Sequence, residues 1–272
     1  MHVLSAQCPE FVEVFTGLRP RQFQRLVKAV QRAGGRALDP GRPGRPWSLS
    51  LKDRVLLVAV YCRTNLSMPQ LAPLFGISTA AVGRIIKRHG PLMTLAPARH
   101  RPGSDDVLVV DGTLVPTRDR SVAASSKNHR YSTNVQVLIK AETKLVLAVG
   151  RPMPGNHNDC IAFADSGIKA ACGNATVIAD GGYRGTGLLI PHRRQAGQER
   201  LEPWKEEHNA SHRRVRARVE HVFARMKNWK ILRDCRLKGD GVYWAVSGVA
   251  RMHNLALAGW PVVRAGNRPA VV

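Results

Sequence analysis

The chain has 272 residues, of which 42 are lysine or arginine and 19 are aspartate or glutamate, so its formal net charge is +23. This balance excludes an acidic disordered chain. The longest apolar run, 55–62, is far shorter than the roughly 20 residues of a membrane-spanning helix. Because the first residues lack the basic-then-apolar pattern of an export signal, we expect a cytoplasmic protein without membrane contact.

The five cysteines are scattered without a CxxC pair, which indicates reduced thiols rather than a disulfide framework or a zinc site. Nucleic acid is the usual polyanion that a cytoplasmic chain of such positive charge binds. An arginine-rich genome gives the same charge without any such partner, so composition alone leaves both explanations open.

A first amphipathic helix is predicted between residues 16 and 35, because apolar residues recur there at helical spacing and a glycine pair ends the pattern. The segment 41–46, GRPGRP, then excludes regular structure through its two glycines and two prolines. Arg42 and Arg45 on such extended backbone are candidates for contact with the minor groove of DNA. A plain linker between helices explains the same composition.

Three further helices are predicted in quick succession within 50–89. Ser50 and Asp53 form a capping box that opens the first, a short second helix ends at Gly76, and Ser78 caps the third. A short helix, a glycine-containing turn and a capped helix with a basic outer face form the helix-turn-helix pattern. Three helices that only pack together are the alternative. The DNA-binding candidates on the third helix are Arg84, Lys87 and Arg88.

From residue 107 the sequence changes to short β-branched runs, and the prolines and glycines of 90–104 mark the boundary of a second domain. Strands predicted over 134–140 and 144–149 are joined by a short turn and should pair as a hairpin. A helix is expected over 159–171.

Two predicted strands, 107–110 and 176–179, are apolar on both faces and each is followed by an aspartate, Asp111 or Asp180. A helical crossover before the second strand favours a parallel pair. If the strands are neighbours, the two carboxylates emerge together at the edge of the sheet where α/β proteins bind ligands. Divalent cations would offset the repulsion between them. An aspartate before glycine is otherwise a common turn former.

The third acidic candidate, Glu220, lies on a basic helix predicted over 211–229. Arg216 and Lys227, four residues before it and seven after, share its face of the helix. A glutamate on a helix so rich in arginine and lysine is well placed to bind a metal ion, while the neighbouring arginine and lysine side chains bind phosphate. A solvated helix with many salt bridges shows the same pattern.

Three blocks in this order resemble the DDE transposase signature: VLVVDGT, then VIADGGY, then RARVEHVFARMKNWKILRDCR. Arg216, three residues, Glu220, six residues and Lys227 match the R-(3)-E-(6)-K pattern of the insertion-sequence transposases of group five, close to the Harbinger type. Arg213 stands where related groups have a tyrosine. The resemblance covers nearly the whole chain, most strongly residues 107–257.

The resemblance implies an α/β fold with two domains and a tail. An all-α helix-turn-helix domain over 1–100 would precede an RNase H-like catalytic domain over 101–262, with the tail at 263–272. The catalytic domain would have a mixed five-stranded sheet with helices on both faces.

The resemblance also implies a transposase that binds the terminal inverted repeats of its element, cleaves the DNA ends and joins their 3′-hydroxyls to target DNA. Asp111, Asp180 and Glu220 would bind two Mg²⁺ ions, for which Mn²⁺ can substitute, since carboxylate oxygens suit hard cations. Two such ions stabilise the attacking and leaving oxygens of a phosphoryl transfer. Arg216 and Lys227 would hold phosphates.

His157 and Asp159 are secondary candidates, in a block, MPGNHND, that resembles the segment before a helix in this group. Asp159 either caps that helix or orients metal-bound water or DNA. The expected partners are double-stranded terminal repeats and target DNA, held by a homo-oligomer because two ends must meet. No nucleotide cofactor is expected, because the P-loop motif is absent.

Two other functions fit part of the sequence. One is a DNA-binding regulator derived from a transposase, without catalysis, and the other is an RNase H-like nuclease or resolvase. The three acids together with Arg216 and Lys227 argue against a pure binding protein. The helix-turn-helix favours the ends of a specific duplex over branched substrates.

Overall fold

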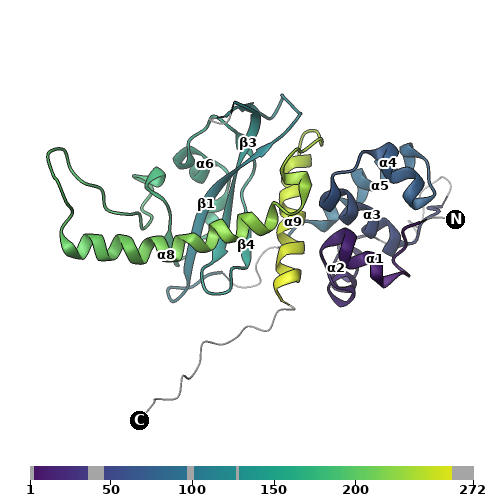
Figure 1. Cartoon of the computed structure of the whole chain (residues 1–272), viewed down its shortest axis with the longest axis horizontal. Coiled ribbons are helices and arrows are strands. Elements are labelled where there is room, and N and C mark those ends of the chain that lie inside the picture. The colour runs from purple at the N-terminus through teal and green to yellow at the C-terminus, as the bar shows by residue number, and fades with distance from the viewer. Residues whose placement is uncertain (1–2, 36–45, 97–100, 127–128, 259–272) are drawn as a thin grey trace, which may run out of the picture.

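The computed structural model describes residues 3–35, 46–96, 101–126 and 129–258 (Figure 1). Arg42 and Arg45 lie outside the described residues, as does the predicted tail, 263–272.

The N-terminal region is helical, as predicted. Its helices are α1 (Pro9–Thr16), α2 (Pro20–Arg32), α3 (Leu51–Thr64), α4 (Met68–Phe75) and α5 (Thr79–His89), followed by the 3₁₀ turn η1 (Pro91–Met93). Helix α1 is an addition to the predicted set. The Ser50 hydroxyl accepts a hydrogen bond from the Asp53 amide (3.1 Å) and the Ser78 hydroxyl accepts one from the Ala81 amide (3.2 Å), so both predicted caps are confirmed.

Six strands of the described chain form one mixed sheet, rather than the five expected. They are β1 (Val107–Pro116), β2 (Ala124–Ser125), β3 (Tyr131–Lys140), β4 (Val146–Val149), β5 (Met153–Pro154) and β6 (Thr176–Ile178). The order is β2-β3-β1-β6, and β4 and β5 also pair with β3. The hairpin of β3 and β4 and the parallel pairing of β1 with β6 are confirmed. Strands of two residues, such as β2 and β5, are too short to produce an alternating pattern.

Two predicted elements have different bounds in the structure. Strand β1 does not end at Asp111 but continues to Pro116, because β3 pairs with it in antiparallel register as far as that residue. The helix expected over 159–171 is two helices, α6 (Asp159–Asp165) and α7 (Ile168–Ala171). Gly167 separates them with a φ of +81°, a left-handed conformation that interrupts the helix.

The remaining helices cross the sheet and close the fold. Helix α8 (Pro203–Met226) begins earlier than predicted, and the 3₁₀ turn η2 (Gly181–Tyr183) precedes it in the chain. The turn η3 (Lys230–Leu232) and helix α9 (Gly241–Leu257) follow it. No helix within the described ranges is long and apolar enough to cross a membrane.

The sheet is covered by helices on both faces, and its alternating side chains belong to two cores. Leu108 and Val110 of β1 pack with Phe163 of α6 on one face. Val109 faces the other way, into a core that includes side chains of α8 and α9 and extends into the N-terminal helices. Figure 1 shows α9 standing between the sheet and these N-terminal helices. The helical region is therefore packed directly onto the region that carries the sheet.

Candidate active site

Asp111 lies in the middle of β1, opposite Val137 of β3. Its side chain is 15% exposed, and its Oδ1 accepts a hydrogen bond from the Gly112 amide at 2.8 Å. Strand β1 is buried on both faces just before this point and only partly buried at it. The carboxylate therefore lies at the margin of the core.

Asp180 follows the neighbouring strand, β6, and lies level with Asp111. Val109 of β1 pairs with Ile178 of β6 in parallel register, and each aspartate comes two residues after its member of this pair. The Asp180 Oδ1 accepts a hydrogen bond from the Gly182 amide (2.7 Å), which fixes the carboxylate at the start of η2. The strand register therefore brings these two acids to the same edge of the sheet.

Glu220 is brought to Asp111 by the packing of α8 across β1 and β6. The Arg216 guanidinium joins the two acids, because its Nη2 lies 2.6 Å from Glu220 Oε1 and its Nη1 lies 3.3 Å from Asp111 Oδ2. The packing face of α8 turns Arg216 and Glu220 toward the sheet edge. Its buried apolar residues are Val219, Val222, Phe223 and Met226.

Lys227 is the residue that follows the last turn of α8. It lies seven positions after Glu220, which corresponds to about 10 Å along the helix axis. Within the described chain, no hydrogen bond or ion pair joins the Lys227 ammonium group to any of the three acids. The structure thus brings Arg216, and not Lys227, into contact with them.

Burial raises the pKa of Asp111 to about 6, from an ordinary value of 3.8. Arg216 opposes this shift, whereas the negative charges of Asp180 and Asp159 add to it. A single guanidinium therefore does not fully compensate the carboxylates at this edge of the sheet. Asp159 belongs to the same electrostatic cluster.

Asp159 is not the cap of α6. The cap is Asn158, whose side-chain oxygen accepts a hydrogen bond from the Ile161 amide at 2.9 Å. As the first residue inside the helix, Asp159 points its carboxylate at the sheet. Its Oδ1 accepts hydrogen bonds from Asn134 Nδ2 (2.9 Å) and Gln136 Nε2 (3.1 Å) of β3.

A buried polar network holds Asp159 in this position. Gln136 is fully buried, and its Oε1 accepts a hydrogen bond of 2.5 Å from the hydroxyl of Tyr183, which is also fully buried. Asn134, Gln136 and Tyr183 were not among the candidates predicted from the sequence. The available signal was the pair of amide side chains two residues apart, just before the apolar run 137–139 of β3, since residues two apart lie on one face of the sheet.

His157 lies beside the cluster, on a cavity of about 400 Å³ that Gly112, Asn134 and Asp159 also line. Its Nδ1 is buried and has no hydrogen-bond partner among the described residues. The backbone oxygen of His157 accepts a hydrogen bond from Asn134 Nδ2 at 3.3 Å. Both secondary candidates are therefore next to the acids.

The donor set of the site suits a hard divalent cation, since it offers carboxylate oxygens and neither thiolate nor imidazole. Among the residues that the structure describes, no three His, Cys, Asp or Glu side chains are close enough to share one ion. Arg216 lies between Asp111 and Glu220 and provides the positive charge there. A metal ion held by both acids would take the place of this guanidinium.

The helix-turn-helix candidates lie on α5, which packs against α3 and α4. Arg84 and Lys87 are exposed and Arg88 is half-buried. Gly76 adopts the left-handed conformation, with a φ of +61°, in the turn between α4 and α5. The basic outer face expected for the second helix of the pair is therefore present.

A mixed sheet with one acid on an internal strand, a second after its parallel neighbour and a third on the helix packed across both defines an RNase H-like catalytic domain. In this chain a helix-turn-helix region precedes that domain.

Comparison with known proteins identifies the family. The model of the transposase DDE domain matches residues 102–255, and the model of the helix-turn-helix of DDE superfamily endonucleases matches residues 47–97. The chain therefore belongs to the DDE transposases of insertion sequences. The narrower resemblance to group five stays a prediction.

Two relatives support this assignment. A protein named as the transposase for insertion sequence element IS112 of Streptomyces albus G is 63% identical over 257 residues, which cover 94% of this chain and 99% of the relative. A protein named as the transposase for element IS702 of Microchaete diplosiphon is 26% identical over 235 residues, which cover 80% of this chain and 83% of the relative.

Proposed function

We propose that the chain binds the terminal inverted repeats of its own insertion sequence, cleaves the DNA at the element ends and joins the resulting 3′-hydroxyls to target DNA. Two observations that relate Asp111, Asp180 and Glu220 to one another support this proposal. Strand register aligns the first two acids, and Arg216 links the first to the third.

Asp111, Asp180 and Glu220 would hold two Mg²⁺ ions, or Mn²⁺ in their place. When bound, such ions neutralise the negative charge that develops on the attacking and leaving oxygens of a phosphoryl transfer. Once the Arg216 guanidinium leaves Asp111, it is free to donate hydrogen bonds to phosphate oxygens. Lys227 would hold a more distant phosphate of the same strand. Asp159, fixed by its buried amide partners, would orient water or DNA beside the acids.

In this proposal α5 recognises the sequence of the terminal repeat and places Arg84, Lys87 and Arg88 in the major groove of the DNA. Arg42 and Arg45 would reach the adjacent minor groove. The two ends of one element must be held together, so the chain would act as a homo-oligomer on DNA. It would work in the bacterial cytoplasm, at the nucleoid, without a nucleotide cofactor.

Cleavage of a labelled duplex that carries the terminal repeat tests this proposal, with Mg²⁺ or EDTA in the buffer. We expect Mg²⁺-dependent nicking at the repeat end by the wild-type chain. Glu220→Gln should lower the rate by about a thousandfold, the equivalent of about 4 kcal/mol of transition-state stabilisation. The variant should still bind the repeat, because α5 is unchanged.

Glu142→Gln is the matched control, since Glu142 is an exposed glutamate in the turn between β3 and β4. It should cleave at the wild-type rate. A wild-type chain that binds the repeat but never cuts, even when a pre-cleaved 3′-hydroxyl end is supplied, would support the regulator alternative instead. Cutting that survives Glu220→Gln would show that Glu220 is not the third acid.

A further inference from the structure

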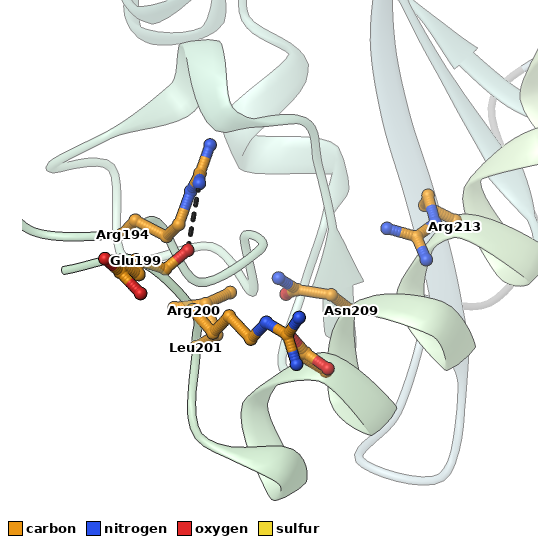
Figure 2. Close-up of a pocket in the computed structure, with 7 residues that line it drawn as sticks. Arg194, Glu199, Arg200, Leu201, Asn209 and Arg213 are labelled. Carbon is orange, nitrogen blue, oxygen red and sulfur yellow. Dashed lines mark hydrogen bonds between the residues drawn. The ribbon is translucent and has the colours of Figure 1, made fainter.

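A second basic site lies on α8, outside the acid cluster. The segment that leads into α8 and the first part of the helix enclose a cavity of about 520 Å³ (Figure 2). In this view Arg213 stands on the side of the cavity opposite Arg194 and Glu199. The lining residues are Arg194, Glu199, Arg200, Leu201, Glu206, Asn209 and Arg213.

The wall of this cavity is fixed to α8 by Asn209, whose side chain is buried. Its Oδ1 accepts a hydrogen bond from the His192 amide at 2.8 Å, and its Nδ2 donates one to the His192 carbonyl at 2.9 Å. An amide that satisfies both backbone groups of His192 holds the following residues, Arg193 and Arg194, at a set distance from the helix.

The same segment connects the cavity to the catalytic acids. Arg193 Nη2 donates a hydrogen bond of 2.9 Å to the carbonyl of Gly181, the residue that follows Asp180. Arg193 therefore lies beside the second acid, while its neighbour Arg194 lines the cavity. One short stretch of backbone thus spans both places.

Helix α8 also connects the cavity to the acid cluster. Arg213 lies seven residues before Glu220, so the two side chains leave the same face of the helix about 10 Å apart along its axis. Arg216, which contacts two of the acids, lies between them. Phosphates of one DNA strand follow each other at about 3.4 Å along the duplex axis. If the strand with its scissile phosphate at Glu220 runs along α8, a phosphate within about three nucleotides of the cut lies beside Arg213.

The charges of the cavity favour an anion. Three arginines line it against two glutamates, Glu199 and Glu206. Arg194 donates one hydrogen bond, to the backbone oxygen of Glu199 at 3.2 Å. In the described part of the chain, no hydrogen bond or ion pair involves the guanidinium of Arg200 or Arg213. Their planar forks of donors match the oxygens of a phosphate diester.

We propose that Arg194, Arg200 and Arg213 form a subsite for a backbone phosphate of the DNA strand, within about three nucleotides of the cleaved bond. This subsite rests on the proposed function, because it assumes that DNA lies across the acids. It also gives a role to Arg213, which stands where related groups of transposases have a tyrosine. The phosphate would fix the strand on the side of the cut that α8 approaches.

Neutral phosphates in the DNA test the subsite without any need for cleavage. Binding of a pre-cleaved end of the chain's own element is measured by fluorescence anisotropy in EDTA. One methylphosphonate replaces each phosphate near the cut in turn. We expect the wild-type chain to lose affinity at one of these positions. Arg213→Ala should bind unmodified DNA about tenfold more weakly than the wild type. Its affinity should not fall further when a methylphosphonate replaces the phosphate at that position. Arg213→Lys should recover part of the affinity.

Arg214→Ala is the matched control, because Arg214 is the next residue, is exposed and donates its hydrogen bond to Ser211 Oγ rather than lining the cavity. It should remain sensitive to the same methylphosphonate. Equal losses for Arg213→Ala and Arg214→Ala, or an Arg213→Ala variant that stays sensitive at every position, would overturn the subsite. Circular dichroism of each variant confirms folding.

Cleavage by the wild-type chain in Mg²⁺ separates this subsite from the function on which it rests. If the wild type cuts its element end while Arg213→Ala stays as sensitive as the wild type to every methylphosphonate, only the subsite is wrong. If the wild type neither binds nor cuts that end, the proposed function is wrong and the subsite is overturned with it.

Discussion

Asp111→Asn is expected to slow cleavage severely and, at the same time, to stabilise the metal-free protein at neutral pH. The rate should fall by about a thousandfold, because the variant lacks one of the carboxylates proposed to hold the metal ions. The gain in stability should be about 1–3 kcal/mol, since the wild-type fold holds a carboxylate whose pKa burial raises from 3.8 to about 6.

The sign of this effect follows from the protons bound in each state. Between about pH 4 and pH 6, folded Asp111 keeps a proton that the unfolded chain has released, so the wild type loses stability as the pH rises. Asparagine does not titrate. The unfolding free energy of Asp111→Asn should therefore exceed that of the wild type by a margin that grows between about pH 4 and pH 6 and stays constant above pH 6.

Urea unfolding in EDTA at a series of pH values measures this difference. Asp165→Asn serves as the control, because Asp165 is an exposed acid at the end of α6, and its substitution should leave the pH profile unchanged. A variant that is less stable than the wild type at pH 7, or a difference independent of pH, would contradict the electrostatic account of the site.

Gly112→Ala should damage both the fold and the site. A Cβ at this position would meet Asp159 Oδ1, and would lie 2.7 Å from Gln136 Nε2 and 2.8 Å from Asn134 Oδ1. Real Cβ atoms do not approach buried polar atoms so closely, so the network that holds Asp159 must move. We expect the unfolding free energy to fall by about 2–3 kcal/mol, and cleavage to fall more than the loss of folded protein explains.

Gly248→Ala is the control for this prediction. Gly248 is buried in α9, and a methyl group added there would have Met93 as its nearest neighbour, at 3.6 Å, an ordinary van der Waals separation. Helix propensity should make this substitution neutral or slightly stabilising. Chemical denaturation and single-turnover cleavage measure both variants. Wild-type values for Gly112→Ala would show that the polar network does not constrain the site.

Local patterns in the sequence were sufficient to predict most of the fold. The caps at Ser50 and Ser78, the β3–β4 hairpin and the parallel pairing of β1 with β6 depend on short-range signals, namely capping residues, strand periodicity and a helical crossover. The bounds of β1 depend instead on a long-range partner. Its extension past Asp111 requires β3, which no local pattern around residue 111 indicates.

The same contrast between local signals and long-range partners applies to the residues of the candidate site. The nearness of Asp111 to Asp180 was predictable, because each follows an apolar strand segment and the two segments pair in parallel. The role of these acids and of Glu220 stays a prediction. The support of Asp159 was not predictable, because Asn134, Gln136 and Tyr183 come from distant segments and meet only in the folded chain. Of the two roles considered for Asp159, the helix cap is wrong: Asn158 and Asp159 are both good capping residues, and the local sequence does not choose between them.

The measurement that tests the central claim most directly is the anomalous diffraction of Mn²⁺ in crystals of the chain bound to a pre-cleaved element end. We expect anomalous peaks for manganese ions that the carboxylates of Asp111, Asp180 and Glu220 coordinate. The Arg216 guanidinium should no longer contact Asp111. Manganese bound elsewhere, with Arg216 still paired to Asp111 and Glu220 beside the DNA end, would contradict the claim that these three acids form the catalytic metal site.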